Sequence, residues 1–258
     1  MDLRLKDAVI CISGGTKGLG REAAIAFAQE GAKVAISGRD TEAINTTVRE
    51  LFEAGAPDAF GLPVNLQDPD SIQCFFAGID ARWGQLNTLV NMAGPNEPSG
   101  SVDFSQVPDD RWQYYFDLTI MSAVRCTKAA LPLMRKGEWG RIVNISSISA
   151  RLVNVADAPY MAAKAGLNAL TKNMAWALAG EGIIVNTVTP GVFRTEGMRT
   201  WMEMACVTDQ YDPDDLGDIW RWMRDVNGGR HGGVNGRVGL PDELAPIVLL
   251  LGSPKNTY

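Results

Sequence analysis

The fold is decided by residues 8–20, Ala8-Val9-Ile10-Cys11-Ile12-Ser13-Gly14-Gly15-Thr16-Lys17-Gly18-Leu19-Gly20. The apolar, β-branched start predicts a strand that stops at a glycine-rich turn, and the alanine-rich segment 21–30 predicts a helix ending at Gly31. Glycines let the backbone approach a pyrophosphate closely, and a helix N-terminus supplies amide donors and a positive dipole end. A glycine loop alone is a weak signal, but its place between a strand and a helix predicts a dinucleotide site with the spacing Gly-x-x-x-Gly-x-Gly.

The remainder of the chain alternates strands and helices in the same way. We expect strands at residues 33–37, 59–64, 86–90, 141–147 and 183–188. We expect helices at 41–54, 69–83 and 108–136, the last kinked or ended early by Pro132, and a further helix that begins near Asp157 or Pro159. This alternation implies an α/β fold, with a doubly wound parallel sheet flanked by helices and joined by right-handed crossovers.

Composition limits the class of protein. The 258 residues, 46% of them hydrophobic, suffice for one large core, and no stretch resembles a linker, so we expect a single domain over residues 1–258. The net charge of -6 and the lack of a basic stripe argue against nucleic acid as a partner. The four cysteines lack paired spacing, so we expect free thiols and no metal site. The N-terminal apolar stretch is too short for a signal peptide or a membrane span, which predicts a soluble, cytoplasmic protein.

The end of the second strand bears on the choice of cofactor. An acidic residue about twenty positions beyond the glycine turn would hold a ribose diol, but Gly38 and Arg39 stand at the strand end. Arg39 and Lys17 suit a 2'-phosphate, because a guanidinium fork matches phosphate oxygens, so NADP(H) is favoured over NAD(H). Asp40 is open to two interpretations: it holds a ribose, or it is the N-cap of the helix 41–54.

The candidate catalytic residues lie in the second half of the chain. Tyr160 and Lys164 are four residues apart, so a helix places both on one face. Lowering a tyrosine pKa of about 10 to near neutrality requires roughly 4 kcal/mol, and Lys164, helped by a bound cofactor's positive ring, is the candidate for that role. The strand 141–147 ends in hydroxyls, so Ser146 or Ser147 can hold a carbonyl oxygen while Tyr160 protonates it. Tyr-x-x-x-Lys alone is a common accident on helix surfaces, so the other motifs must decide.

Five motifs in the same order resemble those of the short-chain dehydrogenase/reductase family. They are SGGTKGLG at 13–20, NMAG at 91–94, Ser147 thirteen residues before Tyr160, Tyr160-x-x-x-Lys164, and Pro190-Gly191 followed by Thr195. The resemblance extends from Leu5 to the last residue and implies a Rossmann-like fold. It implies that Tyr160 is the general acid-base, that Lys164 binds the nicotinamide ribose and acidifies Tyr160, and that Ser147 positions the substrate oxygen.

The resemblance also implies a set of cofactor contacts. The glycine turn would line the pyrophosphate, Asn91 would support the fourth strand and the cofactor, and Val192 and Thr195 would contact the nicotinamide end. The cofactor-binding residues that we expect are Gly14, Thr16, Lys17, Gly18, Leu19, Gly20, Arg39, Asn65, Leu66, Asn91, Ala93, Gly94, Tyr160, Lys164, Pro190, Gly191, Val192 and Thr195.

Three features depart from the family pattern. Thr119 stands where the family usually has an Asn that holds a water in the proton relay, and a hydroxyl lacks the paired geometry of an amide. We nevertheless count Thr119 with the catalytic residues. Asn65 replaces the usual Asp that meets the adenine. The last strand of the family should follow Ser253, where few residues remain.

Residues 192–237 are expected to form a substrate lid. Tryptophan and methionine recur there at helical spacing, which more often packs a lid onto its own domain than contacts a ligand. A lid this apolar suits a bulky hydrophobic ketone or alcohol. Five aspartates between Asp209 and Asp218 make a poor surface for an acidic acyl carrier protein. His231 is expected in a loop, and the glycines around it suggest a hinge that closes the lid on binding.

These features together predict an NADP-dependent oxidoreductase that moves hydride between nicotinamide and a carbonyl or secondary alcohol of a small molecule. Two alternatives stay open: a 3-oxoacyl thioester reductase, and a nucleotide-binding regulatory protein in which Thr119 marks weak or lost catalysis. The resemblance suggests a homodimer or homotetramer formed through the long helices.

Overall fold

The computed structural model describes residues 2–95, 103–152, 158–226 and 236–257. Asp157, His231 and the expected hinge glycines 228, 229, 232 and 233 lie outside this range. The strands are β1 Val9–Ser13, β2 Lys33–Gly38, β3 Ala59–Pro63, β4 Thr88–Asn91, β5 Gly140–Ile145 and β6 Ile183–Val188. The α-helices are α1 Gly18–Gln29, α2 Thr41–Ala54, α3 Pro69–Trp83, α4 Asp109–Phe116, α5 Ser122–Met134, α6 Ala158–Leu178, α7 Glu196–Met204, α8 Leu216–Val226 and α9 Ala245–Leu251.

The strands form one parallel sheet in the order β3-β2-β1-β4-β5-β6. Strands β2 and β3 are added in turn on one side of β1. The chain then crosses to the other side of β1, where β4, β5 and β6 are added in turn. The parallel, doubly wound sheet predicted from the alternating pattern is thereby confirmed. Because all the strands run in the same direction, their carboxyl ends meet at one edge, and the order reverses between β1 and β4.

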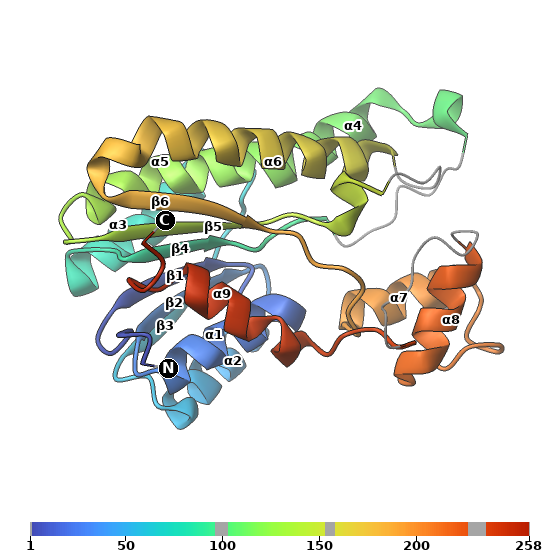
Figure 1. Cartoon of the computed structure of the whole chain (residues 1–258), viewed down its shortest axis with the longest axis horizontal. Coiled ribbons are helices and arrows are strands. Elements are labelled where there is room, and N and C mark those ends of the chain that lie inside the picture. Colours follow the sequence, from blue (N-terminus) through green and yellow to red (C-terminus); the bar gives the residue numbers. More distant parts are fainter. Residues whose placement is uncertain (1, 96–102, 153–157, 227–235, 258) are drawn as a thin grey trace.

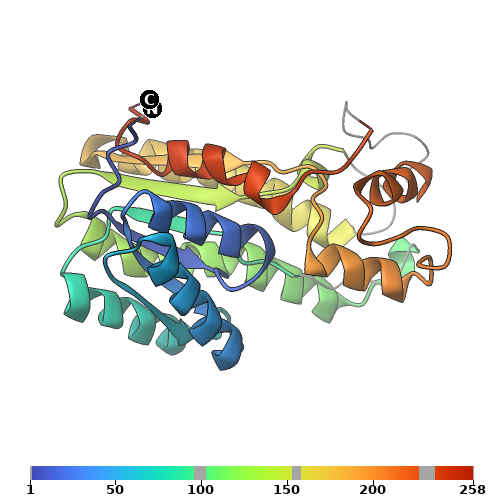
Figure 2. The same cartoon turned by 90° about the horizontal axis from the view of Figure 1, so that it is seen from below.

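Helices cover both faces of the sheet (Figure 1). Helices α1, α2 and α9 lie on one face, where apolar side chains such as Phe27, Leu51 and Val248 form a continuous core with the sheet. Helices α3, α5 and α6 cover the other face through residues such as Phe75, Leu133 and Met174. Figure 2 shows the first group of helices from below. Because helices cover both faces, every residue of β1, β4 and β5 is buried.

The long helix predicted over 108–136 is continuous from α4 to α5, but it contains a π-helical turn at Asp117–Met121. The buried residues of this turn are Thr119 and Ile120. Helix α6 packs against this turn so closely that a Cβ at Gly166 would lie 2.7 Å from Cδ1 of Ile120. Pro132 does not end the helix early, since α5 continues to Met134.

Arg141 lies near the start of β5, at the edge of the sheet away from the strand carboxyl ends, and ties neighbouring segments together there. Its side chain is buried and donates hydrogen bonds to the carbonyl oxygens of Ser253, Gly140 and Gly182. Burial lowers the pKa of this guanidinium. Residues 253–257 form turns and no strand, so within the described residues the sheet lacks the last strand of the family pattern. No helix in the described ranges is long and apolar enough to cross a membrane.

Candidate active site

The glycine turn after β1 occupies the point where the strand order reverses. Gly14 and Gly18 adopt positive φ angles of 75° and 52°, which glycine tolerates best. The amides of Gly14 and Gly15 each donate to the carbonyl of Ser37 at 3.0 Å, which fixes the turn to the end of β2. A Cβ at Gly20 would lie 2.1 Å from the carbonyl oxygen of Gly14, so only glycine fits there. The turn is therefore folded back tightly over the start of α1.

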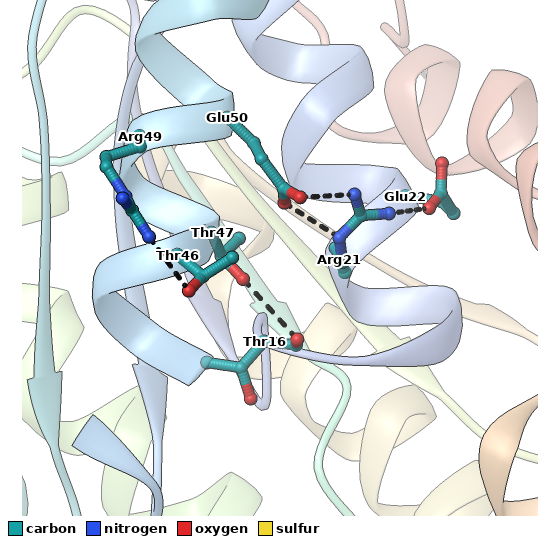
Figure 3. Close-up of polar contacts among 7 residues, drawn as sticks. All are labelled: Thr16, Arg21, Glu22, Thr46, Thr47, Arg49 and Glu50. Atoms are coloured by element: carbon teal, nitrogen blue, oxygen red, sulfur yellow. Dashed lines mark hydrogen bonds and ion pairs between the residues drawn. The ribbon is translucent and has the colours of Figure 1, made fainter. Parts of the chain in front are cut away.

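Helices α1 and α2 hold this turn from the side (Figure 3). The hydroxyl of Thr47 on α2 donates to the carbonyl oxygen of Thr16 at 3.4 Å. Arg21 on α1 makes a two-contact ion pair with Glu50 of α2, with both nitrogen–oxygen distances 2.8 Å. A Cβ at Gly38 would come within 2.7 Å of Cγ2 of Thr16. The turn therefore depends on close packing of α1, α2 and the end of β2.

The N-terminus of α1 is suited to an anion. Lys17 is its N-cap and provides no side-chain hydrogen bond to the helix, and no acidic side chain lies in the first turn. Backbone amides and a positive dipole end are therefore left for a negatively charged group. The half-buried Leu19 packs into the core beneath the turn. The glycines of the turn have no side chains to obstruct a ligand. These features together fit the pyrophosphate of a dinucleotide.

The two predicted phosphate-binding cations differ in their surroundings. Lys17 forms an ion pair of 3.2 Å with Glu196, the first residue of α7, and both side chains are more than half exposed. Arg39 is exposed directly after β2. Asp40 caps α2 by accepting hydrogen bonds from the amides of Glu42 and Ala43 at 2.9 and 3.3 Å. The N-cap interpretation of Asp40 is thus confirmed, whereas Glu196 was not anticipated, because it lies far from Lys17 in the sequence.

The segment after β3 is arranged by local hydrogen bonds. Asn65 is exposed, and its side-chain oxygen accepts from the amide of Gln67 at 3.1 Å. Leu66 is buried, and its carbonyl oxygen accepts from Arg125 on α5 at 3.3 Å. Arg125 is also ion-paired to Asp117 in the π-helical turn at 2.8 Å. The predicted adenine end and the long helix are therefore connected through Arg125.

Asn91 at the end of β4 links this strand to β5 and, through it, to α6. Its amide nitrogen donates to Asn144 of β5 at 2.8 Å, and Asn144 donates in turn to Thr171 of α6 at 2.9 Å. Asn144 is fully buried and belongs to none of the sequence motifs. Ala93 packs against the glycine turn, since its Cα would be 3.1 Å from a Cβ at Gly14. The chain after β4 therefore lies directly beside the turn.

Tyr160 and Lys164 share one face of α6, as their spacing predicts. The ammonium nitrogen of Lys164 lies 5.7 Å from the ring centroid of Tyr160 and donates to the carbonyl oxygen of Ile145 at 2.7 Å. Lys164 is only 4% exposed. Burial lowers its pKa from 10.5 to about 8. A Cβ at Gly94 would be 3.4 Å from the Lys164 nitrogen, so the segment after β4 reaches this pair.

The two serines after β5 differ in their availability. Ser146 is buried, and its hydroxyl donates to the carbonyl oxygen of Lys164 at 3.2 Å. Ser147 is half-buried and caps a 3₁₀ turn by accepting from the amide of Ser149 at 3.2 Å. As an acceptor in that bond, Ser147 keeps its hydroxyl proton for another partner. Ser147 is therefore the better placed of the two to bind a substrate oxygen.

Thr119 lies in the π-helical turn, which packs against α6. Its side chain is buried, and its hydroxyl oxygen has no hydrogen-bond partner among the described residues. A buried hydroxyl without a partner costs free energy, about 1–3 kcal/mol, unless a water or ligand satisfies it. The position is therefore suited to binding a water molecule.

The chain after β6 meets both the serine turn and the glycine turn. The carbonyl oxygen of Pro190 accepts from the amide of Ile148 at 2.8 Å, and Gly191 is exposed. Thr195 caps α7 by accepting from the amide of Met198 at 3.1 Å, and its Cγ2 would be 3.4 Å from a Cβ at Gly18. Val192 accepts from the amide of Gly239 at 3.0 Å. This segment thus closes one side of the site.

Helices α7 and α8 form a small hydrophobic core of their own. Its buried residues include Met202, Trp222 and Met223, and the rings of Trp201 and Trp222 pack with centroids 4.8 Å apart. Met204 is 60% exposed. Most of the tryptophan and methionine side chains thus pack within the segment itself, as the commoner interpretation predicts. Figure 1 shows this pair of helices beside the carboxyl edge of the sheet.

Comparisons with known proteins identify the family of this chain. The sequence profile described as short chain dehydrogenase matches residues 8–205. YvrD, an oxidoreductase of Bacillus subtilis (strain 168), is 36% identical over 83% of this chain and 79% of its own. The 3-oxoacyl-[acyl-carrier-protein] reductase FabG of Vibrio cholerae is 29% identical over 99% of this chain and 94% of its own.

Solved structures extend the comparison. The L-sorbose reductase of Gluconobacter frateurii, complexed with NADPH and L-sorbose, aligns with a TM-score of 0.88 at 27% identity, covering 100% of this chain and 94% of that one. A variant of actinorhodin polyketide ketoreductase with NADPH aligns with a TM-score of 0.84 at 30% identity, covering 97% and 92%. The chain therefore belongs to the short-chain dehydrogenase/reductase family, as an NAD(P)-binding oxidoreductase of CH–OH and C=O groups.

Proposed function

We propose that this enzyme is NADP-dependent and interconverts a ketone and a secondary alcohol on a bulky, hydrophobic small molecule. The observation that carries the proposal is the arrangement of Ser147, Tyr160 and Lys164 beside the glycine turn. The apolar α7–α8 segment supports a hydrophobic substrate, and we propose that residues 192–237 act as its lid within a single domain over residues 1–258.

A nicotinamide held beside Tyr160 and Lys164 would supply or accept the hydride. In the reductive direction, Ser147 donates a hydrogen bond to the carbonyl oxygen, and the Tyr160 hydroxyl gives its proton to that oxygen as negative charge develops. Lys164 stabilises the resulting phenolate, because with a pKa of about 8 it is mainly a cation at neutral pH. Thr119, with its buried hydroxyl, holds a water that returns the proton to Tyr160.

The proposed cofactor contacts follow the same arrangement. Amides of the glycine turn and of the α1 N-terminus bind the pyrophosphate, and Arg39 and Lys17 bind the 2'-phosphate. Two NADPH-bound reductases among the similar structures support this preference. The segments at Asn65–Leu66, Asn91–Gly94 and Pro190–Thr195 complete the proposed cofactor site.

The proposal is tested first by comparing NADPH and NADH titrations, monitored by tryptophan fluorescence. We expect tighter binding of NADPH, and we expect Arg39→Ala to weaken NADPH binding more than NADH binding, because only NADPH carries the 2'-phosphate. Arg49→Ala serves as a control, since this exposed arginine of α2 contacts Thr46 instead. Equal losses for both cofactors would exclude Arg39 as the phosphate ligand.

Turnover tests the catalytic assignment. With NADPH and a panel of bulky ketones, Tyr160→Phe should abolish turnover while leaving NADPH binding within about twofold, because the ring and its packing remain. Tyr211→Phe is the control, because it also removes a tyrosine hydroxyl, one that is hydrogen-bonded to Asp225 of α8, and turnover should persist in it. Retained turnover in Tyr160→Phe would remove Tyr160 from the mechanism.

A second candidate is a 3-oxoacyl thioester reductase, favoured by the similarity to FabG. Activity on an acyl carrier thioester well above that on free bulky ketones would select it. The acidic segment 209–218 argues against an acidic carrier as partner. The regulatory alternative is not supported, because the relatives are oxidoreductases.

We also propose that the enzyme is a homodimer or homotetramer. Phe116 at the end of α4 and Trp176 near the end of α6 are 48% and 87% exposed, respectively. Apolar side chains at such exposure on neighbouring long helices are suited to contact a second copy. Sedimentation velocity should give a multiple of the monomer mass, and a monomeric mass would refute this.

A further inference from the structure

Tyr115 is a buried aromatic residue that contacts the proposed acid-base. It lies on α4, one turn before Thr119, and its exposed fraction is 0%. The ring centroids of Tyr115 and Tyr160 are 6.2 Å apart, and the two planes meet at 78°. This is an edge-to-face arrangement, which has a preferred angle and therefore opposes rotation of either ring.

Tyr115 is itself held in place by neighbours on α4. The guanidinium carbon of Arg111 lies 5.4 Å from the centroid of the Tyr115 ring, in a cation–π contact. The ring of Tyr114 packs on Tyr115 at 5.7 Å and 89°. Helix α4 is packed along α6, which carries Tyr160. The position of the Tyr115 ring is thus set by the helix pair, and it can serve as a fixed surface.

Tyr160 is only half-buried, so its own burial does not fix its ring. Lys164 contacts the ring from within α6, and Tyr115 contacts it from another helix. We propose that Tyr115 is a positioning residue that holds the Tyr160 phenol in the orientation for proton transfer. This inference rests on the proposed role of Tyr160 and adds a residue that the family motifs do not include. The role belongs to the aromatic ring of Tyr115, which makes the contact with the Tyr160 ring.

The test compares Tyr115→Leu with Tyr115→Phe in the full chain, using a ketone that the parent enzyme reduces. Tyr115→Leu should lower kcat about 10-fold to 100-fold with little change in KM, because a misplaced catalytic group affects the chemical step. Tyr115→Phe should keep kcat within about twofold, since the ring remains. Phe75→Leu, a buried aromatic residue on α3 away from the site, controls for general loss of packing.

A second measurement is independent of turnover. In protein labelled with ¹³C-tyrosine, the signal of Tyr160 is assigned by its loss in Tyr160→Phe, and its ring-flip rate is measured by NMR. Faster flipping in Tyr115→Leu, but not in Tyr115→Phe or Phe75→Leu, is expected. Unchanged flipping in Tyr115→Leu overturns the inference, as does an equal loss of kcat in Tyr115→Leu and Tyr115→Phe. Retained turnover in Tyr160→Phe would instead refute the proposed function, so the two failures are distinguishable.

Discussion

At the scale of single residues, Lys164 combines burial with a potential charge. Its nitrogen has one carbonyl partner, Ile145, and no carboxylate is hydrogen-bonded or ion-paired to it in the described structure. Desolvation therefore lowers its pKa to about 8. Between pH 10.5 and 8, the unfolded chain takes up a proton that the folded chain does not, so folding stability falls as the pH falls through this window.

This linkage gives a measurable prediction for Lys164→Met. The free energy of unfolding of the parent protein, relative to that of Lys164→Met, should rise by roughly 3 kcal/mol between pH 8 and pH 10.5, and should be flat below pH 7. Urea unfolding of both proteins over this range measures the difference. The other titrating groups are common to both proteins and cancel. A difference that stays constant with pH would show that burial does not perturb this lysine.

At the scale of secondary structure elements, Asp40 has two proposed roles that a mutation can distinguish, capping of α2 and binding of a cofactor ribose. Its carboxylate accepts two backbone hydrogen bonds in the first turn. Asp40→Ala should therefore lower the free energy of unfolding by about 1 kcal/mol and leave NADH binding unchanged. Thermal unfolding and cofactor titration measure the two effects.

Asp68→Ala is the matched control for this prediction. Asp68 caps α3 by accepting from the amide of Asp70 at 3.0 Å, so a similar loss of stability is expected. A selective loss of NADH affinity in Asp40→Ala would show that this carboxylate also holds the ribose.

The elements also show what the sequence could and could not predict. The apolar run of β1 and the glycines after it predict their structure because the signals are local. The family resemblance selects Ser147 over Ser146 from the sequence, whereas the contact that occupies Ser146, its hydroxyl bonded to the Lys164 carbonyl oxygen, is seen only in the structure. The π-helical turn around Thr119 carries no local signal, because it arises where α6 packs against the long helix. Contacts between distant residues, such as Tyr115 with Tyr160, likewise depend on tertiary packing.

At the scale of the whole molecule, the α7–α8 segment has a core separate from those of the sheet. Its links to the rest include the Lys17–Glu196 ion pair, and a bridge between Phe193 and Gly239 joins the chain entering the segment to the chain leaving it. A unit with few such links can open without unfolding of the sheet. Local opening of this segment is therefore expected to cost less free energy than global unfolding.

Trp222→Ala tests this separation. The side chain is 3% exposed, and removing such a ring typically costs about 3–5 kcal/mol. Amide hydrogen exchange should become faster throughout α7 and α8, whereas protection of β1 and α1 should stay as in the parent protein. Met204 is on the same segment but is exposed, so Met204→Ala should leave amide exchange unchanged both in α7 and α8 and in the sheet. Uniformly faster exchange over the sheet would show that the segment and the sheet unfold as one unit.

The ion pair between Lys17 and Glu196 has a consequence for cofactor exchange. A phosphate group that approaches Lys17 meets a carboxylate that is already bound there, on a helix of the same chain. Glu196 therefore acts as an intramolecular competitor, whose effective concentration is set by the position of α7. On the proposal that Lys17 binds a cofactor phosphate, movement of α7 away from the glycine turn removes the competitor and strengthens the attraction of Lys17 for phosphate, so we expect the position of this helix and the retention of the cofactor to be thermodynamically coupled.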